Sequence, residues 1–144
     1  MKINIICIGK LKEKYFADAQ TEYIKRIQPY ASIKILEFDD DNLNSDSKIL
    51  KAIENTYPIA LAINANMISS EELAKKIKEY QINSISSISF IIGGSDGLSK
   101  KILSKCQEKI SISKLTFPHR LARIIWIEQI YRSFKIIKNE PYHK

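Results

Sequence analysis

The sequence contains little glycine, and most of it is concentrated in one place. Only four of the 144 residues are glycine, and three of them lie between Gly93 and Gly97. Glycine reaches backbone angles that other residues avoid, and it allows a ligand to approach the main chain closely. Because the run follows an apolar segment at 88–92 that is typical of a buried strand, we expect a ligand site at the carboxyl end of that strand. A tight strand-to-helix turn without a ligand is the alternative.

Cysteine is also scarce, and long apolar runs are missing. The two cysteines, Cys7 and Cys106, lie far apart and show no metal-ligand spacing, so we expect neither a disulfide nor a cysteine metal site. No apolar run reaches the roughly 18 residues that cross a bilayer, and the N-terminus lacks the cleavage pattern of a secretory signal peptide. We therefore expect a cytoplasmic protein that does not span a membrane.

Acidic residues are outnumbered by basic ones. Lysine and arginine total 23 against 16 aspartate and glutamate residues, which gives a net charge of +7 and a pI of about 9.3. This excess favours a polyanionic partner such as nucleic acid, although a solvated basic surface is the alternative. The acidic, turn-rich stretch Asp39–Ser45 has the composition of a mobile loop. No further carboxylates stand at the fixed spacings of a metal site, so no metal is expected.

Apolar segments of strand and helix period alternate along the chain. The predicted strands cover residues 2–8, 33–38, 59–63, 88–92 and 110–113. The predicted helices cover residues 13–27, 46–55, 69–80 and 99–107, followed by a final helix that starts near Pro118. This alternation predicts a single α/β domain over residues 1–144, with a mostly parallel sheet and helices on both faces.

The final helix carries apolar residues on more than one face. They include Ile124, Trp126, Ile127, Ile130 and Phe134. Such a helix is either buried on two sides, or packs on one side and docks a partner subunit on the other.

Two loops at the same edge of the predicted sheet could together hold a small molecule. One is the Gly93–Gly97 turn, and the other is the segment Ser113–Arg120, which joins the last strand to the final helix. Loops that follow parallel strands meet at one edge, where small-molecule sites are common. Taken singly, Thr116 could serve only as a helix cap and His119 only as an exposed first-turn residue.

Charged residues of the final helix and of the chain end form two further candidates. Glu128 and Arg132 stand four residues apart and could pair, while Arg123 or Arg132 could instead contact phosphate. The tail at 139–144 combines Tyr142, which could stack on a base, with His143, which could move a proton. A simple salt bridge and a frayed chain end are the alternatives.

The glycine run matches neither common nucleotide-binding pattern. It follows the fourth strand without the G-x-G-x-x-G spacing of dinucleotide sites, and no Gly-Lys-Ser/Thr of a phosphate-binding loop occurs. The lack of a phosphate loop after the first strand also disfavours a flavodoxin-like nucleotide-binding protein.

Five segments together resemble one family of enzymes. They read GKLKEKY at 9–15, IIGGSDGL at 91–98, SKLTFPH at 113–119, IEQIYR at 127–132 and YHK at 142–144. In this combination the sequence is similar to the RlmH type of pseudouridine N3-methyltransferase, which acts on 23S ribosomal RNA. The resemblance implies a SPOUT fold with a deep C-terminal trefoil knot, a homodimer, and S-adenosyl-L-methionine as methyl donor. It also implies the large ribosomal subunit or the 70S ribosome as substrate.

The resemblance also implies where the donor binds. The implied residues lie at the ends of the third, fourth and fifth strands and are Leu61, Gly93, Ile112, Ser113, Lys114, Leu115, Thr116 and Phe117. The first of these loops departs from the family, which commonly has an acid, a glycine and a lysine where this chain has Ala62, Ala65 and Asn66. Asn64 and Asn66 tolerate left-handed backbone angles, which would offset the missing glycine.

Methylation of an imide nitrogen defines what the remaining residues must do. The ring proton has to leave, the resulting anion needs stabilisation, and a water-poor pocket favours its attack on a sulfonium. We expect Arg132 to stabilise the anion, His143 to accept the proton, Tyr142 to position the base and Glu128 to orient Arg132. A SPOUT methyltransferase that acts on transfer RNA or on a different ribosomal position, and a non-catalytic RNA-binding module, are the alternatives.

Overall fold

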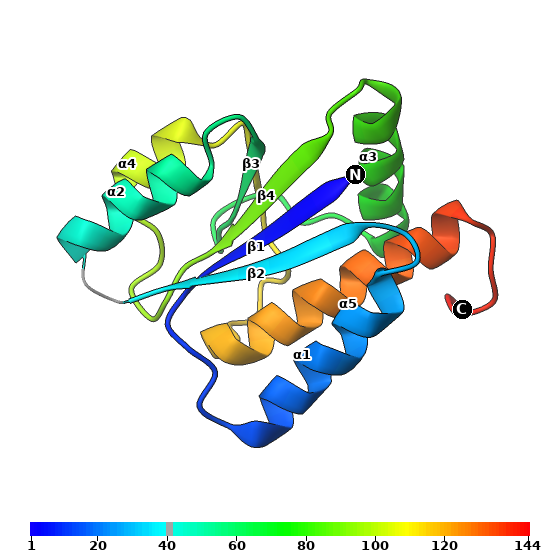
Figure 1. Ribbon diagram of the computed structural model, residues 1–144, viewed down its shortest axis with the longest axis horizontal. Coiled ribbons are helices and arrows are strands. Elements are labelled where there is room, and N and C mark those ends of the chain that lie inside the picture. The colour runs from blue at the N-terminus through cyan, green and yellow to red at the C-terminus, as the bar shows by residue number, and fades with distance from the viewer. Residues whose placement is uncertain (40–41) are drawn as a thin grey trace.

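Within residues 1–39 and 42–144, which the computed structural model describes, five parallel strands form one sheet (Figure 1). They are β1 (Lys2–Ile8), β2 (Ser32–Phe38), β3 (Tyr57–Leu61), β4 (Ser87–Ile92) and β5 (Glu108–Ile110). Their order across the sheet is β2-β1-β4-β3-β5. The predicted parallel sheet is confirmed. Asp40 and Asp41, within the predicted acidic loop, lie outside the described residues.

Helices cover both faces of the sheet, as predicted (Figure 1). One face carries α1 (Lys14–Ile27), α3 (Ser70–Ile82) and α5 (His119–Ile137), and the other carries α2 (Asn42–Ala52) and α4 (Lys100–Lys105). Successive side chains of a strand point to opposite faces. The isoleucines of β1 therefore serve both cores: Ile3 and Ile5 pack into the first, and Ile6 and Ile8 into the second.

Some element bounds differ from the predicted ones. β3 ends at Leu61, two residues before the predicted end, and α2 begins four residues before the predicted start and ends at Ala52. The start of α3 agrees closely with its predicted cap. The Ser69 hydroxyl accepts a hydrogen bond from the Glu72 backbone amide at 3.1 Å, and the Ser69 amide donates to the Glu72 carboxylate at 2.6 Å.

The last strand lies earlier in the chain than the apolar pattern predicts. β5 covers Glu108–Ile110, and residues 111–113 are released into a loop. The Glu108 carboxylate accepts hydrogen bonds from the hydroxyls of Tyr57 and Tyr80 and from the Lys76 ammonium, each at 2.8 Å. These partners satisfy a charged group inside an edge strand, and an apolar pattern gives no signal for them.

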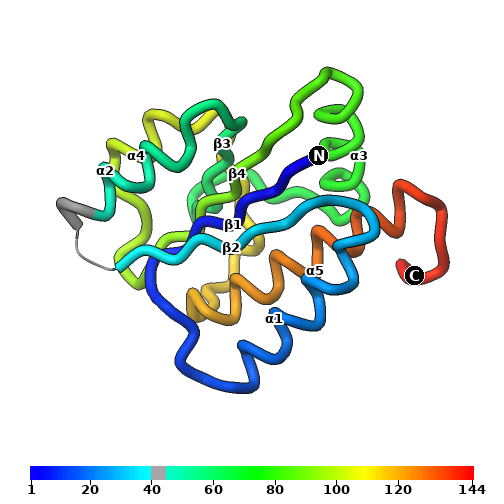
Figure 2. Tube along the Cα trace, in the orientation of Figure 1, coloured from blue at the N-terminus to red at the C-terminus, as the bar shows by residue number. Residues whose placement is uncertain are grey.

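The helix α5 is buried on two sides, which was one of the two predicted arrangements. It packs on the sheet and lies between α1 and α3. Trp126 and Ile130 are buried there, and the Trp126 ring meets Phe90 of β4 edge-on with 5.2 Å between ring centroids. The helix starts beside the carboxyl ends of the strands and runs away from them, so the chain end emerges on the far side of the molecule (Figure 2).

Candidate functional site

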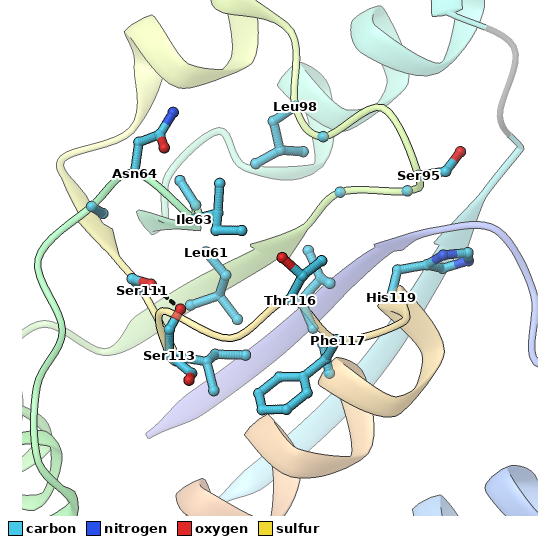
Figure 3. A pocket seen from close by; sticks show the side chains of 18 of the residues that line it. Leu61, Ile63, Asn64, Ser95, Leu98, Ser111, Ser113, Thr116, Phe117 and His119 are labelled. Carbon is cyan, nitrogen blue, oxygen red and sulfur yellow. Dashed lines mark hydrogen bonds between the residues drawn. The ribbon is translucent and has the colours of Figure 1, made fainter.

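A cavity of about 990 Å³ lies at the carboxyl ends of β3, β4 and β5 (Figure 3). Its lining comes from three loops and from the start of α5. Seven of the eight residues implied for donor binding line it: Leu61, Gly93, Ile112, Ser113, Leu115, Thr116 and Phe117. The eighth, Lys114, is exposed and is not part of the lining. The three predicted loops therefore meet around one hollow.

The glycine turn brings main-chain atoms to the cavity wall. Gly97 has a φ of +74°, and its amide donates to the Gly94 carbonyl at 3.0 Å to close the turn. A Cβ added to Gly93 would lie 2.6 Å from the carbonyl carbon of Gly97. Gly93 is therefore required by the close approach of the backbone and Gly97 by its left-handed angle, which explains why the scarce glycines gather here.

The loop after β5 forms the opposite wall of the cavity. The Ser111 hydroxyl donates to the Ser113 carbonyl at 3.0 Å, drawn as a dashed line in Figure 3. The Ser113 hydroxyl in turn accepts a hydrogen bond from the Leu115 amide at 2.9 Å. Thr116 faces the cavity and is not the helix cap, because the N-cap residue of α5 is Pro118, without a side-chain hydrogen bond.

The loop after β3 closes without the glycine of the family. The Ala65 amide donates to the Ala62 carbonyl at 3.2 Å, and the Ser111 amide donates to the Asn66 carbonyl at 3.0 Å. The prediction that Asn64 or Asn66 offsets the missing glycine with a left-handed backbone angle is wrong, because neither residue has a positive φ. The loop instead turns with ordinary angles and is tied to the loop after β5.

The start of α5 connects the cavity to the loop after β1. His119 lines the cavity and is only half-exposed. Gly9 has a φ of +95°, and a Cβ added there would lie 3.6 Å from the His119 Nε2. His119 is therefore part of the junction between these segments and not simply an exposed first-turn residue.

The expectation that Arg123 contacts phosphate is wrong. Its side chain is 1% exposed, and it donates to the Glu37 carboxylate at 2.7 Å and to the Gly9 carbonyl at 2.9 Å. Arg120 is also engaged within the chain, since it pairs with Glu13 at 3.0 Å. Both arginines hold the loop after β1 against α5.

The four residues predicted to act on the acceptor lie together at the other end of α5. Arg132 donates to the Glu128 carboxylate at 2.8 Å, as predicted for a pair four residues apart, and the Tyr142 hydroxyl donates to the same carboxylate at 2.9 Å. The guanidinium carbon of Arg132 lies 4.7 Å from the centre of the Tyr142 ring. The His143 Nδ1 lies 3.2 Å from Arg132 Nη1. The tail is therefore ordered against α5 and is not a frayed chain end.

The carboxylate of Glu128 influences the protonation of both of its partners. The hydrogen bond to Glu128 raises the pKa of Arg132. Burial, together with the hydrogen bond to Glu128, raises the pKa of Tyr142 to about 12. Both groups therefore keep their protons at neutral pH and can serve as donors.

Sequence reasoning missed one residue of this cluster. The Glu71 carboxylate, in the first turn of α3, lies 2.6 Å from the His143 Nε2. Glu71 and His143 are 72 positions apart in the chain, and no spacing rule joins them. Glu71 could have been noticed only as an acid near the predicted start of α3, where helices commonly carry acids.

Arg132, Glu128, Tyr142, His143 and Glu71 form what we call the tail cluster. Within one chain the cavity and the tail cluster are far apart. His119 lines the cavity, whereas Arg132 lies thirteen residues later on the same helix. At 1.5 Å per residue this places them about 20 Å apart along the helix axis. Figure 2 shows the carboxyl ends of the strands and the C-terminus of the chain on opposite sides of the molecule.

Two other kinds of site were searched for in the part of the chain that the structure describes. No group of three or more His, Cys, Asp or Glu side chains is placed to hold a metal ion there. Likewise, none of the described helices has the length and apolar character needed to cross a bilayer.

Comparisons with known proteins identify the family. The family model described as "Predicted SPOUT methyltransferase" matches residues 1–143. The chain is 48% identical to the Ribosomal RNA large subunit methyltransferase H of Clostridium novyi (strain NT) and 42% identical to that of Enterococcus faecalis (strain ATCC 700802 / V583), with 100% of each chain covered in both cases.

Solved structures agree at the level of the fold. The crystal structure of TrmJ from Z. mobilis ZM4 superposes with a TM-score of 0.59 at 12% identity, covering 100% of this chain and 73% of that one. Together with the full-length sequence matches, this shows that the protein belongs to the SPOUT methyltransferase family, alongside the relatives named Ribosomal RNA large subunit methyltransferase H.

Proposed function

We propose that this protein transfers a methyl group from S-adenosyl-L-methionine to N3 of a pseudouridine in 23S ribosomal RNA. The name of its full-length relatives supports the large ribosomal subunit as substrate. The observation that carries the proposal is the cavity at the strand ends, which gathers the glycine turn and two neighbouring loops. The excess of basic residues is consistent with an RNA partner.

The cavity suits the proposed donor. Its volume of about 990 Å³ is at the upper end of the range for small-molecule sites. Leu61, Ile92 and Phe117 supply apolar surface, and the Gly93–Gly97 turn supplies main-chain groups that no side chain covers. When bound, S-adenosyl-L-methionine would supply an electrophilic methyl group on a sulfonium, and a water-poor pocket favours the attack of an anion on it because the reaction cancels both charges.

The tail cluster supplies what the acceptor needs. Glu128 holds Arg132 in place, and the guanidinium of Arg132 stabilises the anion that forms when the imide nitrogen loses its proton. His143 accepts that proton. Arg132 already lies against the Tyr142 ring, so we assign Tyr142 a positioning role at the entering base.

A complete site requires two copies of the chain. The tail cluster is about 20 Å along α5 from the cavity of its own chain. We therefore propose a homodimer in which the tail of one copy reaches the cavity of the other. The C-terminal trefoil knot of SPOUT proteins, a cytoplasmic location, and an assembled large subunit or 70S ribosome as substrate belong to the same proposal.

Mass mapping of ribosomal RNA tests the function. Cells without this protein should lack one methyl group on a single pseudouridine of the large-subunit RNA, and the wild-type gene should restore it. The His143→Ala variant should not restore it at a normal rate, although it should still bind S-adenosyl-L-methionine in calorimetry. Identical methylation maps with and without the protein would contradict the proposal, and a wild-type protein that gives no heat with the donor would favour a non-catalytic RNA-binding module.

A further inference from the structure

Both ring nitrogens of His143 have a partner, and the two partners come from different helices. Arg132 on α5 lies 3.2 Å from Nδ1, and Glu71 on α3 lies 2.6 Å from Nε2. A guanidinium has only donors, so Nδ1 must accept the hydrogen bond from Arg132. The neutral ring therefore carries its proton on Nε2 and donates it to the Glu71 carboxylate.

Glu71 is well placed to hold a charge at this point. It lies in the first turn of α3, where the helix dipole favours an anion. Its own backbone amide and the His143 ring hold the pKa of Glu71 below its ordinary value, so it is ionised at neutral pH. Its side chain is 63% exposed, so the pair contributes little to folding stability, and its importance lies in the geometry that it imposes on the ring.

We propose that Glu71 is a positioning residue for methyl transfer, which fixes the Nε2–H tautomer of His143 and thereby makes Nδ1 the proton acceptor. This inference rests on the proposed function. It adds to that function a residue from a different helix, and it names the nitrogen of His143 that acts.

The proton transfer can be followed bond by bond. The single lone pair of Nδ1 accepts from Arg132 in the free protein, so this hydrogen bond has to open when the base enters, and Arg132 then donates to the base instead. The N3–H bond of the pseudouridine breaks, and the proton moves to the freed lone pair of Nδ1, so that the ring becomes an imidazolium. The N3 electron pair then forms the bond to the methyl carbon as the carbon–sulfur bond of the donor breaks, and that second electron pair stays on sulfur. No oxidant, metal or further reactant is needed.

The charge balance gives Glu71 a second task. After the transfer, an imidazolium would lie next to the Arg132 guanidinium, and these like charges repel. Glu128 faces Arg132 from the same helix, and Glu71 faces the imidazolium from α3. Lys144, the next residue in the chain, is a further cation. Glu71 is therefore the carboxylate that directly offsets the positive charge gained by His143.

The tautomer can be measured without any methylation assay. In mildly alkaline buffer, where a histidine ring is neutral, long-range proton–nitrogen NMR of His143 in the full-length protein should show the Nε2–H form as the dominant species. In Glu71→Ala the fraction of the Nδ1–H form should rise, because the carboxylate that accepts from Nε2 is lost and only the Arg132 contact at Nδ1 still favours the Nε2–H form. Glu71→Gln should largely restore the Nε2–H form, since its amide oxygen still accepts. Glu79→Ala removes an equivalent charge from the same helix and should leave the tautomer unchanged.

Kinetics then test the role in the reaction. In Glu71→Ala, kcat should fall about tenfold, a fraction of the 10²–10⁴ that a general base commonly contributes, while KM for S-adenosyl-L-methionine stays within about twofold. Glu71→Gln should recover part of this loss in kcat, because it restores the tautomer but not the charge. An unchanged tautomer in Glu71→Ala, or an unchanged kcat despite a changed tautomer, would overturn the inference. A wild-type enzyme that methylates no ribosomal RNA would instead overturn the proposed function, whatever the tautomer.

Discussion

At the scale of single residues, Arg123 shows how a buried charge can stabilise the fold instead of binding a ligand. It lies one turn after His119 and joins the ends of β1 and β2 to α5 through Gly9 and Glu37. Burial raises the pKa of the nearby Cys7 thiol to about 12, which indicates a poorly hydrated surrounding. In such surroundings a cation persists only with a full set of partners, so the arginine and its acceptors depend on each other.

Replacing Arg123 with methionine keeps most of the volume and removes the donors. Removal of one partner from a fully buried ion pair costs roughly 3–5 kcal/mol, and because Glu37 is partly exposed we expect a loss of about 2 kcal/mol. Chemical denaturation followed by circular dichroism measures this loss. Lys14→Gln removes an exposed ion pair with Asp18 and should change the free energy of unfolding by less than about 0.5 kcal/mol. Equal effects of the two variants would show that the Arg123 contacts do not stabilise the fold.

At the scale of elements, the turn after β4 is the most constrained connection around the cavity. Gly93→Ala would place a methyl group 2.6 Å from the carbonyl carbon of Gly97, so the turn must shift. We expect the affinity for S-adenosyl-L-methionine to fall at least about tenfold, or roughly 1.4 kcal/mol. Isothermal calorimetry measures the change. Ser86→Ala, at the opposite end of β4, should bind like the wild type, and unchanged binding by Gly93→Ala would show that the donor does not depend on this turn.

The same elements show how far sequence reasoning reaches. The glycine turn was predictable because glycine is rare in this chain and its backbone requirements are strict. The bounds of β5 were not, because Glu108 is kept in its strand by Tyr57, Tyr80 and Lys76, which lie elsewhere in the sequence. The contact of Glu71 with His143 was hidden for the same reason, since only the folded chain brings the two residues together.

At the scale of the whole molecule, the cavity lies at the start of α5 and the tail cluster towards its end. Figure 2 shows the C-terminus on the side of the molecule away from the carboxyl ends of the strands. Local sequence patterns predicted most of the residues of the cavity lining and of the tail cluster. The distance between these two sets of residues depends instead on the direction and length of α5. This separation leads to the proposed dimer, in which each site takes its cavity from one copy and its tail from the other.

Mixed dimers test this arrangement. Gly93→Ala damages only the cavity and His143→Ala only the tail, so each variant alone should have little activity. When the two are co-expressed, random pairing makes half of the dimers mixed, and each mixed dimer contains one intact site. Activity should therefore recover to about one quarter of the wild-type value. Either variant expressed alone is the control, and no recovery on co-expression would show that each site is built within one copy.

The strand order also has a consequence for synthesis. β4 pairs with β1 on one side and with β3 on the other, so the segment that unites the sheet is made fourth among the strands. Until residues 87–92 are available, β1 lacks its second neighbour and β3 lacks the strand that joins it to β1, so any such edges that form are open to other polypeptides. We therefore expect the first half of the protein to be prone to misassociation until the second half has been made.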